Sequence, residues 1–175
     1  MALRGRFTDV TPRADRLLDT NGDGTGTKNA NVDGSVTPVV FKCSPPATGA
    51  VVIERIMINV RDSGTFTAEK YGALAELTNG IEVGIFSDSD DSLVTDYLDG
   101  VPIKSNAGWG RACYDVDVKT WGAGDSFLLM RWTLSKSGTR LILRDSDNYS
   151  FGIKVNDDLT GLVEHYFTCQ GFSTE

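Results

Sequence analysis

The chain has 175 residues, of which 40% are hydrophobic and 19 are glycine, a composition that suits one domain of many short strands joined by tight turns. Its formal net charge of −7 repels phosphate and argues against direct nucleic-acid binding. The sequence shows neither a secretory signal after Met1 nor an apolar run of membrane-spanning length. We therefore expect no membrane partner and synthesis in a reducing compartment.

Residues 1–37 are rich in Gly, Asn, Asp and Thr and contain few large apolar side chains. Such a segment buries too little surface to order itself, so we predict an extended N-terminal arm before a domain formed by residues 38–175. The arm begins with a basic stretch on an otherwise acidic chain, which suits docking on an acidic neighbour. We expect it to lie along a neighbouring subunit, with folding back along its own domain as the alternative. The arginines expected at that interface are Arg4, Arg6, Arg13 and Arg16.

Beyond the arm, short segments with a β pattern follow one another, separated by turn residues. Helix signals are nearly absent, and only residues 67–76 suit a few helical turns, which Gly72 weakens. The expected strands are residues 38–43, 51–61, 65–71, 81–86, 93–98, 111–118, 125–134, 139–144, 149–155 and 162–172.

Residues 125–134 form the densest apolar run and contain neither Gly nor Pro. Alternation places two sets of side chains on opposite faces, and both sets are at least half apolar, which indicates a central strand covered on two sides. The even-numbered face is the cleaner one and is predicted to be the core. The odd-numbered face needs a second cover, from the same chain or from a neighbouring molecule. The even set is Leu128, Met130, Trp132 and Leu134, and the odd set is Phe127, Leu129, Arg131 and Thr133.

No alternation of strands with helices appears, so we predict an all-β fold. Its expected form is an antiparallel β-sandwich of the jelly-roll type with the extended N-terminal arm. An immunoglobulin-like sandwich is the alternative, but the Cys–Trp–Cys framework that would favour it is not spaced for it.

Asp19, Asn21 and Asp23 alternate with small residues, as in the first half of a calcium-binding loop. The twelfth position of that loop would be Ala30, where the metal requires a bidentate Glu, and no helices flank the segment. A turn rich in Gly and Asx residues is therefore the favoured interpretation, with a calcium site as the alternative.

Trp109 and Trp121 lie in Gly-rich segments that we interpret as loops, so both are candidates for exposed aromatic residues. The favoured interpretation of such residues is that they plug the end of a barrel or fill an interface, and the alternative is a platform for sugar rings, as in sandwich lectins. His165 is the only histidine and is expected to be packed and hydrogen-bonded. The three cysteines are interpreted as buried thiols rather than as a disulfide framework. No spacing assembles a nucleophile with a base, so no catalytic residue is assigned.

Several stretches together resemble small structural proteins of tailed bacteriophages, of the kind found on capsids or at the head–tail region. The similarity is one of turns and strands and carries no catalytic signature. It covers about residues 18–172 and rests on Leu18–Gly26, Leu77–Ile81, Asp99–Trp109, Arg131–Gly138 and Asn156–Phe167.

The resemblance implies a non-enzymatic virion component, first of all a capsid decoration (cement) protein that needs no cofactor. Its implied partners are the major capsid protein or other virion subunits, together with further copies of itself, a trimer among the options. It would be made in the host cytoplasm and act in the virion. A tail or head–tail adaptor component is the first alternative, and a carbohydrate-binding receptor-recognition module is the second.

Overall fold

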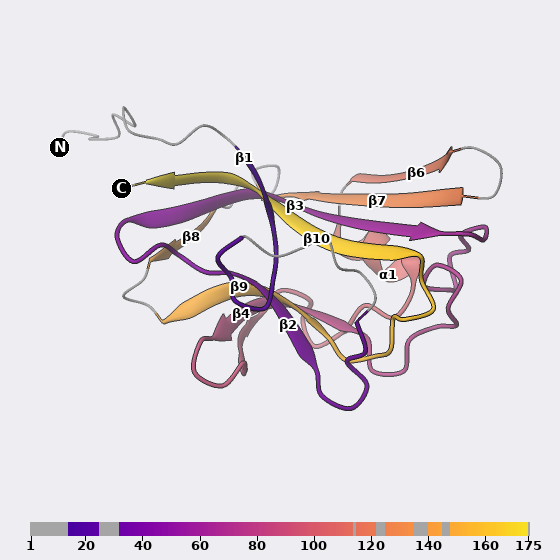
Figure 1. Cartoon of the computed structure of the whole chain (residues 1–175), viewed down its shortest axis with the longest axis horizontal. Helices are drawn as coiled ribbons and strands as arrows, with labels where there is room; N and C mark the ends of the chain where they lie inside the picture. The colour runs from indigo at the N-terminus through magenta and orange to yellow at the C-terminus, as the bar shows by residue number, and fades with distance from the viewer. Residues whose placement is uncertain are drawn as a thin grey trace.

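A computed structural model describes residues 14–24, 32–113, 115–121, 125–134, 140–144 and 148–174. Two antiparallel sheets pack face to face, which confirms the predicted all-β sandwich (Figure 1). No helix in the described part of the chain is long and apolar enough to cross a membrane.

The larger sheet is built around β3 (Ala50–Asp62), which pairs with three other strands. Its order is β1-β10-β3-β7-β6, and β8 pairs with the first half of β3. The remaining bounds are Ala14–Leu17 for β1, Glu164–Thr174 for β10, Asp125–Thr133 for β7, Asp115–Trp121 for β6 and Leu141–Arg144 for β8.

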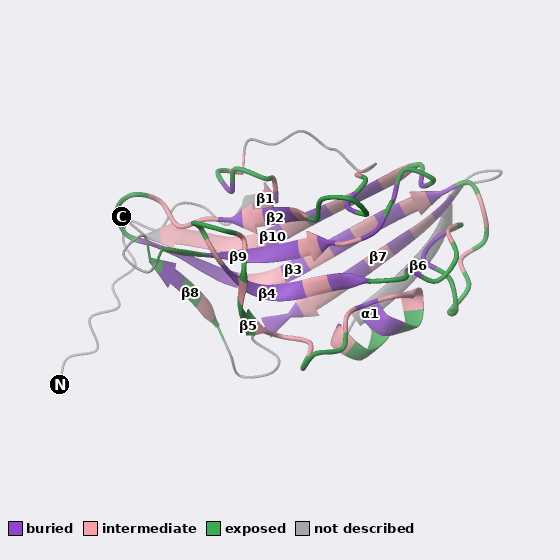
Figure 2. Cartoon of the chain, turned by 90° about the horizontal axis from the view of Figure 1, so that it is seen from below, coloured by how far each residue is buried: buried purple, intermediate pink, exposed green. Residues whose placement is uncertain are grey.

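The smaller sheet has the order β2-β9-β4-β5. Its strands are β2 (Val39–Cys43), β9 (Tyr149–Val155), β4 (Ile81–Ser87) and β5 (Leu93–Asp96). One short helix, α1 (Asn106–Ala112), follows β5 and lies beside one end of the sandwich (Figure 2).

The core lies between the sheets, and strand alternation determines which side chains enter it. In β7, Leu128 and Met130 are 2% and 0% exposed, as the alternation predicts, while the odd-numbered neighbours are half-buried. In β3, Ile56 and Ile58 are buried in the same way. The alternating bands along the central strands are visible in Figure 2.

The predicted arm boundary at residue 37 is wrong. Ala14–Leu17 pairs antiparallel with β10 as the edge strand of the larger sheet, and Leu18 is buried in the core. Further along, Gly34 donates a backbone hydrogen bond to Asp157. The alternative in which the segment folds back along its own domain therefore holds for residues 14–24 and 32–37. Residues 1–13 and 25–31 lie outside the described residues.

Three local predictions are also wrong. Residues 65–71 form turns rather than a strand, and residues 67–76 form no helix. The predicted strand 111–118 begins instead as the end of α1, so Arg111 is helical and Cys113 is buried.

Candidate functional site

A surface hollow of about 310 Å³ lies between the end of β5 and helix α1. It owes its shape to the tight turn after β5, where the Asp96 carboxylate accepts backbone hydrogen bonds from Leu98 at 2.7 Å and Gly100 at 2.6 Å. Asp99 and Gly100 have φ values of 53° and 77°, in the left-handed region where Asp is tolerated and Gly is favoured. Local turn chemistry therefore builds one wall of this hollow, which we call the β5–α1 hollow.

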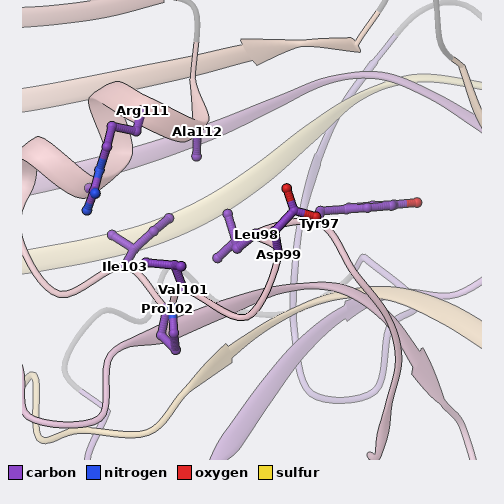
Figure 3. A pocket seen from close by; sticks show the side chains of 9 residues that line it. Tyr97, Leu98, Asp99, Val101, Pro102, Ile103, Arg111 and Ala112 are labelled. Atoms are coloured by element: carbon purple, nitrogen blue, oxygen red, sulfur yellow. The ribbon is translucent and has the colours of Figure 1, made fainter.

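The opposite wall comes from Ile103 and from α1. Ile103 exchanges two backbone hydrogen bonds of 2.9 Å with Ile81, so it is fixed to the edge of β4. A Cβ on Gly108 would stand 3.1 Å from the Ile103 side chain, so glycine lets the helix approach this closely. The full lining is Tyr97, Leu98, Asp99, Val101, Pro102, Ile103, Gly108, Arg111 and Ala112 (Figure 3).

The hollow is mainly apolar, with few polar groups at its rim. Arg111 and Asp99 are exposed, and Val101 is 55% exposed. Tyr97 packs edge-on against Trp132 with ring centroids 6.1 Å apart, and partial burial raises the pKa of its hydroxyl. An apolar depression with a guanidinium beside it suits an aliphatic or aromatic side chain of a partner protein better than it suits bond-breaking chemistry.

The outer face of the larger sheet is the second candidate surface. It combines apolar and basic side chains on β3, β7 and β10 with polar ones such as Asn59 and Thr168 and with the acidic Glu164, all of them half-buried, and no described helix or strand lies over it (Figure 1). We define this outer face by Arg55, Met57, Arg61, Phe127, Leu129, Arg131 and Tyr166.

Contacts within the sheet hold its arginines in place. The Arg61 guanidinium lies 5.6 Å from the centroid of the Phe127 ring and 3.8 Å from the Glu164 carboxylate. Arg55 donates to the Gln170 side chain at 3.2 Å. The Nε atom of Arg131 is buried without a hydrogen-bond partner. Arginine, methionine and aromatic residues are the types enriched at the centres of protein interfaces, so this face has the composition of a docking surface.

Trp109 is fully buried, so it is neither an exposed interface residue nor a platform for a sugar ring. Its indole N–H donates to the Tyr71 hydroxyl at 3.1 Å, and the indole belongs to the core between α1 and the sheets. Trp121 is the last residue of β6, and its side chain lies outside the described residues.

His165 continues the same buried network, as the sequence predicts. Its Nε2 lies 3.1 Å from the Tyr71 hydroxyl. That hydroxyl also accepts from Trp109, so the three side chains form one hydrogen-bonded group. Burial lowers the pKa of His165 to about 3 and raises the pKa of Tyr71. A neutral imidazole sealed in the core fits a structural role rather than proton transfer with a substrate.

The calcium-like stretch folds as the favoured turn. The Asp19 carboxylate accepts backbone hydrogen bonds from Asn21 at 2.9 Å, Gly22 at 2.5 Å and Gly24 at 2.9 Å. Both of its oxygens therefore bind amide donors, while Asn21 and Asp23 are exposed. Among the described residues, no group of three or more His, Cys, Asp or Glu side chains is placed to hold a metal ion.

The four arginines of the predicted interface divide into two groups. The Arg16 guanidinium bonds within its own chain, to the backbone carbonyls of Gly22 and Ser44, so it stabilises the fold and is a poor candidate for an intersubunit contact. Arg4, Arg6 and Arg13 lie outside the described residues, and their interface role stays a prediction.

The sequence reasoning missed the β5–α1 hollow, although part of its signal was present. Asp99-Gly100 is a strong turn signature, and it falls just after the predicted strand 93–98. The helix had no such signal because two glycines interrupt Asn106–Ala112.

No protein-family model, curated protein or solved structure matches this chain. The functional proposal therefore rests on the two surfaces, the buried network and the sequence pattern. Of these features, the surfaces alone are accessible to another molecule.

Proposed function

We propose that this chain is a non-enzymatic structural protein of a bacteriophage virion, and specifically a capsid decoration protein that binds and stabilises neighbouring capsid subunits. The observation that carries the proposal is the outer face of the larger sheet. Met57, Phe127 and Leu129 stand there among arginines on central strands, at positions where a strand with a solvated outer face would carry polar residues.

The strand order supports the jelly-roll form of the sandwich. Apart from β6 and β8, the strands pair in nested fashion: β1 with β10, β2 with β9, β3 with β7, and β4 with β5. A long antiparallel ribbon wrapped into two sheets gives this nesting, and double-sheet jelly rolls occur in viral capsid proteins. One fold hosts many functions, so the proposed docking has to be explained by the residues of the outer face.

Docking by this face would combine apolar contact with charge pairing. Met57, Leu129 and Tyr166 supply area that a partner removes from water, while the arginines pair with carboxylates on the partner. Each contact is modest for a protein of this size, and the symmetry of a shell repeats it many times. Arg4, Arg6 and Arg13 would add a second point of attachment, which raises the effective concentration of the first.

The test is occupancy on particles assembled with each variant. Arg131→Glu together with Leu129→Asp places repulsive charge in the centre of the outer face, and we expect at least a tenfold loss of bound protein. Lys70→Glu, on an exposed turn away from this face, is the matched control and keeps occupancy at the level of the unaltered protein. Equal occupancy of all three proteins would overturn the proposal, provided that circular dichroism shows the same fold.

A tail or head–tail adaptor component is the second candidate, because the same docking surface serves either position. Copy number separates the two, since a decoration protein is present in hundreds of copies and an adaptor ring in few. The carbohydrate-binding alternative has lost Trp109 to the core, so a glycan array on Trp121→Ala is its remaining test.

A further inference from the structure

Two cysteines meet across the interior of the sandwich. Phe41 of β2 and Phe167 of β10 meet across the two sheets, with ring centroids 5.4 Å apart and planes tilted by 52°. Cys43 and Cys169 follow two residues later in each strand, so alternation points them to the same inner faces. The Cys169 side chain lowers the pKa of Cys43 as a hydrogen-bond partner, so the two side chains lie close together between the smaller sheet and the larger.

Arg16 completes this site. It is the cross-strand partner of Cys169 in the β1–β10 pair, and its Nη1 lies 3.6 Å from the Cys43 sulfur. The hydrogen bond from Cys169 and the positive charge of Arg16 lower the pKa of Cys43, against the effect of burial. A guanidinium beside a thiol favours the thiolate, which is the nucleophilic form.

Cys113 provides the contrast within the same molecule. It is also buried, at 4% exposure, but burial raises the pKa of its thiol to about 12. Cysteine oxidation follows thiolate character, so Cys113 is the inert thiol of the three.

The surface near the pair carries a hollow. A hollow of about 480 Å³ is lined by Arg16, Gly22 and Ser44 among others, and Ser44 is the chain neighbour of Cys43. Cys43 and Cys169 are themselves 0% and 3% exposed, so only a small reagent is expected to reach them. Hydrogen peroxide is small and uncharged, and it meets this requirement.

We propose that Cys43 and Cys169 are a redox-active pair that a peroxide converts into a disulfide between the two sheets. The Cys43 thiolate attacks one peroxide oxygen, the O–O bond breaks, and a sulfenic acid and hydroxide form. The Cys169 sulfur then attacks the Cys43 sulfur, and the sulfenic hydroxyl leaves as water with the Cys169 proton. Both sulfurs are oxidised, and the peroxide ends as two molecules of water.

The bridge would fix β2 to β10 by a covalent bond and restrict the unfolded chain over most of its length. A protein made in a reducing compartment would gain it only after meeting an oxidising medium. The inference holds for the isolated protein and does not rest on the proposed virion function.

The test treats the full chain with hydrogen peroxide, or with a reducing thiol as the reference, and maps the cysteine peptides by mass spectrometry. We expect a linked Cys43–Cys169 peptide, a whole-protein mass lower by two hydrogen atoms, and a Tm raised on the order of 10 °C. Cys113→Ala forms the bridge at an unchanged rate. The proposal would be overturned if Cys43 and Cys169 stay reduced and form no bridge. Oxidation of Cys113 at the same rate as Cys43 would overturn it as well.

Two variants of Arg16 isolate the effect of its charge. Both Arg16→Gln and Arg16→Lys lose the guanidinium contacts with Gly22 and Ser44, so both disturb the turn alike. We expect the bridge to form about tenfold more slowly in Arg16→Gln and nearly as fast as normal in Arg16→Lys. Equal rates in the two variants would show that the charge does not activate Cys43 and would contradict the assigned role.

Discussion

The inner and outer faces of the larger sheet are built from the same strands and differ in almost every physical respect. In β3, Ile56, Ile58 and Val60 are at most 1% exposed and meet the smaller sheet, whereas Met57, Asn59 and Arg61, which alternate with them, are half-buried. The inner face is mostly apolar, with His165 as an exception, and stabilises the fold through burial. The outer face mixes apolar and basic groups, which suits reversible contact with another protein. Folding and docking therefore use alternate residues of the same strand.

The largest expected effect separates two neighbours in β3. Ile58→Ala opens a cavity in the core and should lower the free energy of unfolding by about 3 kcal/mol. Met57→Ala, one residue away on the outer face, should cost under about 1 kcal/mol, since its side chain keeps contact with water. Chemical denaturation of both variants measures the difference, and equal losses would contradict the distinction between the faces.

The next effect uses His165, which is opposite Val60 on the inner face. Its pKa is lowered to about 3 in the folded protein, while the unfolded chain has the ordinary value near 6.5. Between those pH values the unfolded chain binds more protons, so the stability present above pH 6.5 is lost progressively as the pH falls towards 3. We expect a slope of about 1.4 kcal/mol per pH unit in this window from His165 alone. In His165→Gln this contribution to the slope should vanish; an unchanged slope would mean that His165 is not buried as a neutral group.

A smaller effect is expected for Arg61 on the outer face. Arg61→Gln removes the contact with Phe127 and the ion pair with Glu164, which together should cost under about 1 kcal/mol because the groups are partly in water. The loss should shrink further as salt is added. Thermal melts at low and high ionic strength check this, and a loss as large as that of Ile58→Ala would place Arg61 among the core residues.

The smallest expected effect on stability comes from deleting residues 2–13. The deletion spares β1 (Ala14–Leu17), so the Tm should change by no more than about 2 °C. Occupancy on assembled particles should nevertheless fall, since Arg4, Arg6 and Arg13 are lost. A large drop in Tm would show that this segment belongs to the fold, and unchanged occupancy would count against its docking role.

Alternation alone predicted the inner face of β7 at Leu128 and Met130, because burying the even face leaves no choice for the odd face. It was wrong near the end of the strand, where Trp132 is half-buried and Thr133 is buried. It failed at Arg111 and Ala112, where the same alternation runs through the end of a helix that tertiary contacts impose on a glycine-containing segment. It also failed at Trp109, since Gly108 signals a loop in the sequence but serves the close approach of α1 to Ile103.

The predicted arm was too long for a related reason. A four-residue edge strand needs little more than backbone pairing with β10 and one anchor, Leu18, so its composition resembles that of an unstructured segment. The Cys43–Cys169 pair was also beyond reach, because its two residues lie far apart in the chain. The lining of the β5–α1 hollow falls within residues 97–112, and the hollow was missed because the helix that forms one of its walls gave no signal in the sequence.

The most direct measurement is a cryo-electron microscopy map of a particle that contains this chain. We predict density for the sandwich at many symmetry-related positions on the capsid, with Met57, Leu129 and Arg131 covered by an acidic surface of a neighbouring subunit. A map in which the outer face of the larger sheet points into solvent while another surface makes the contacts would contradict the proposed docking role.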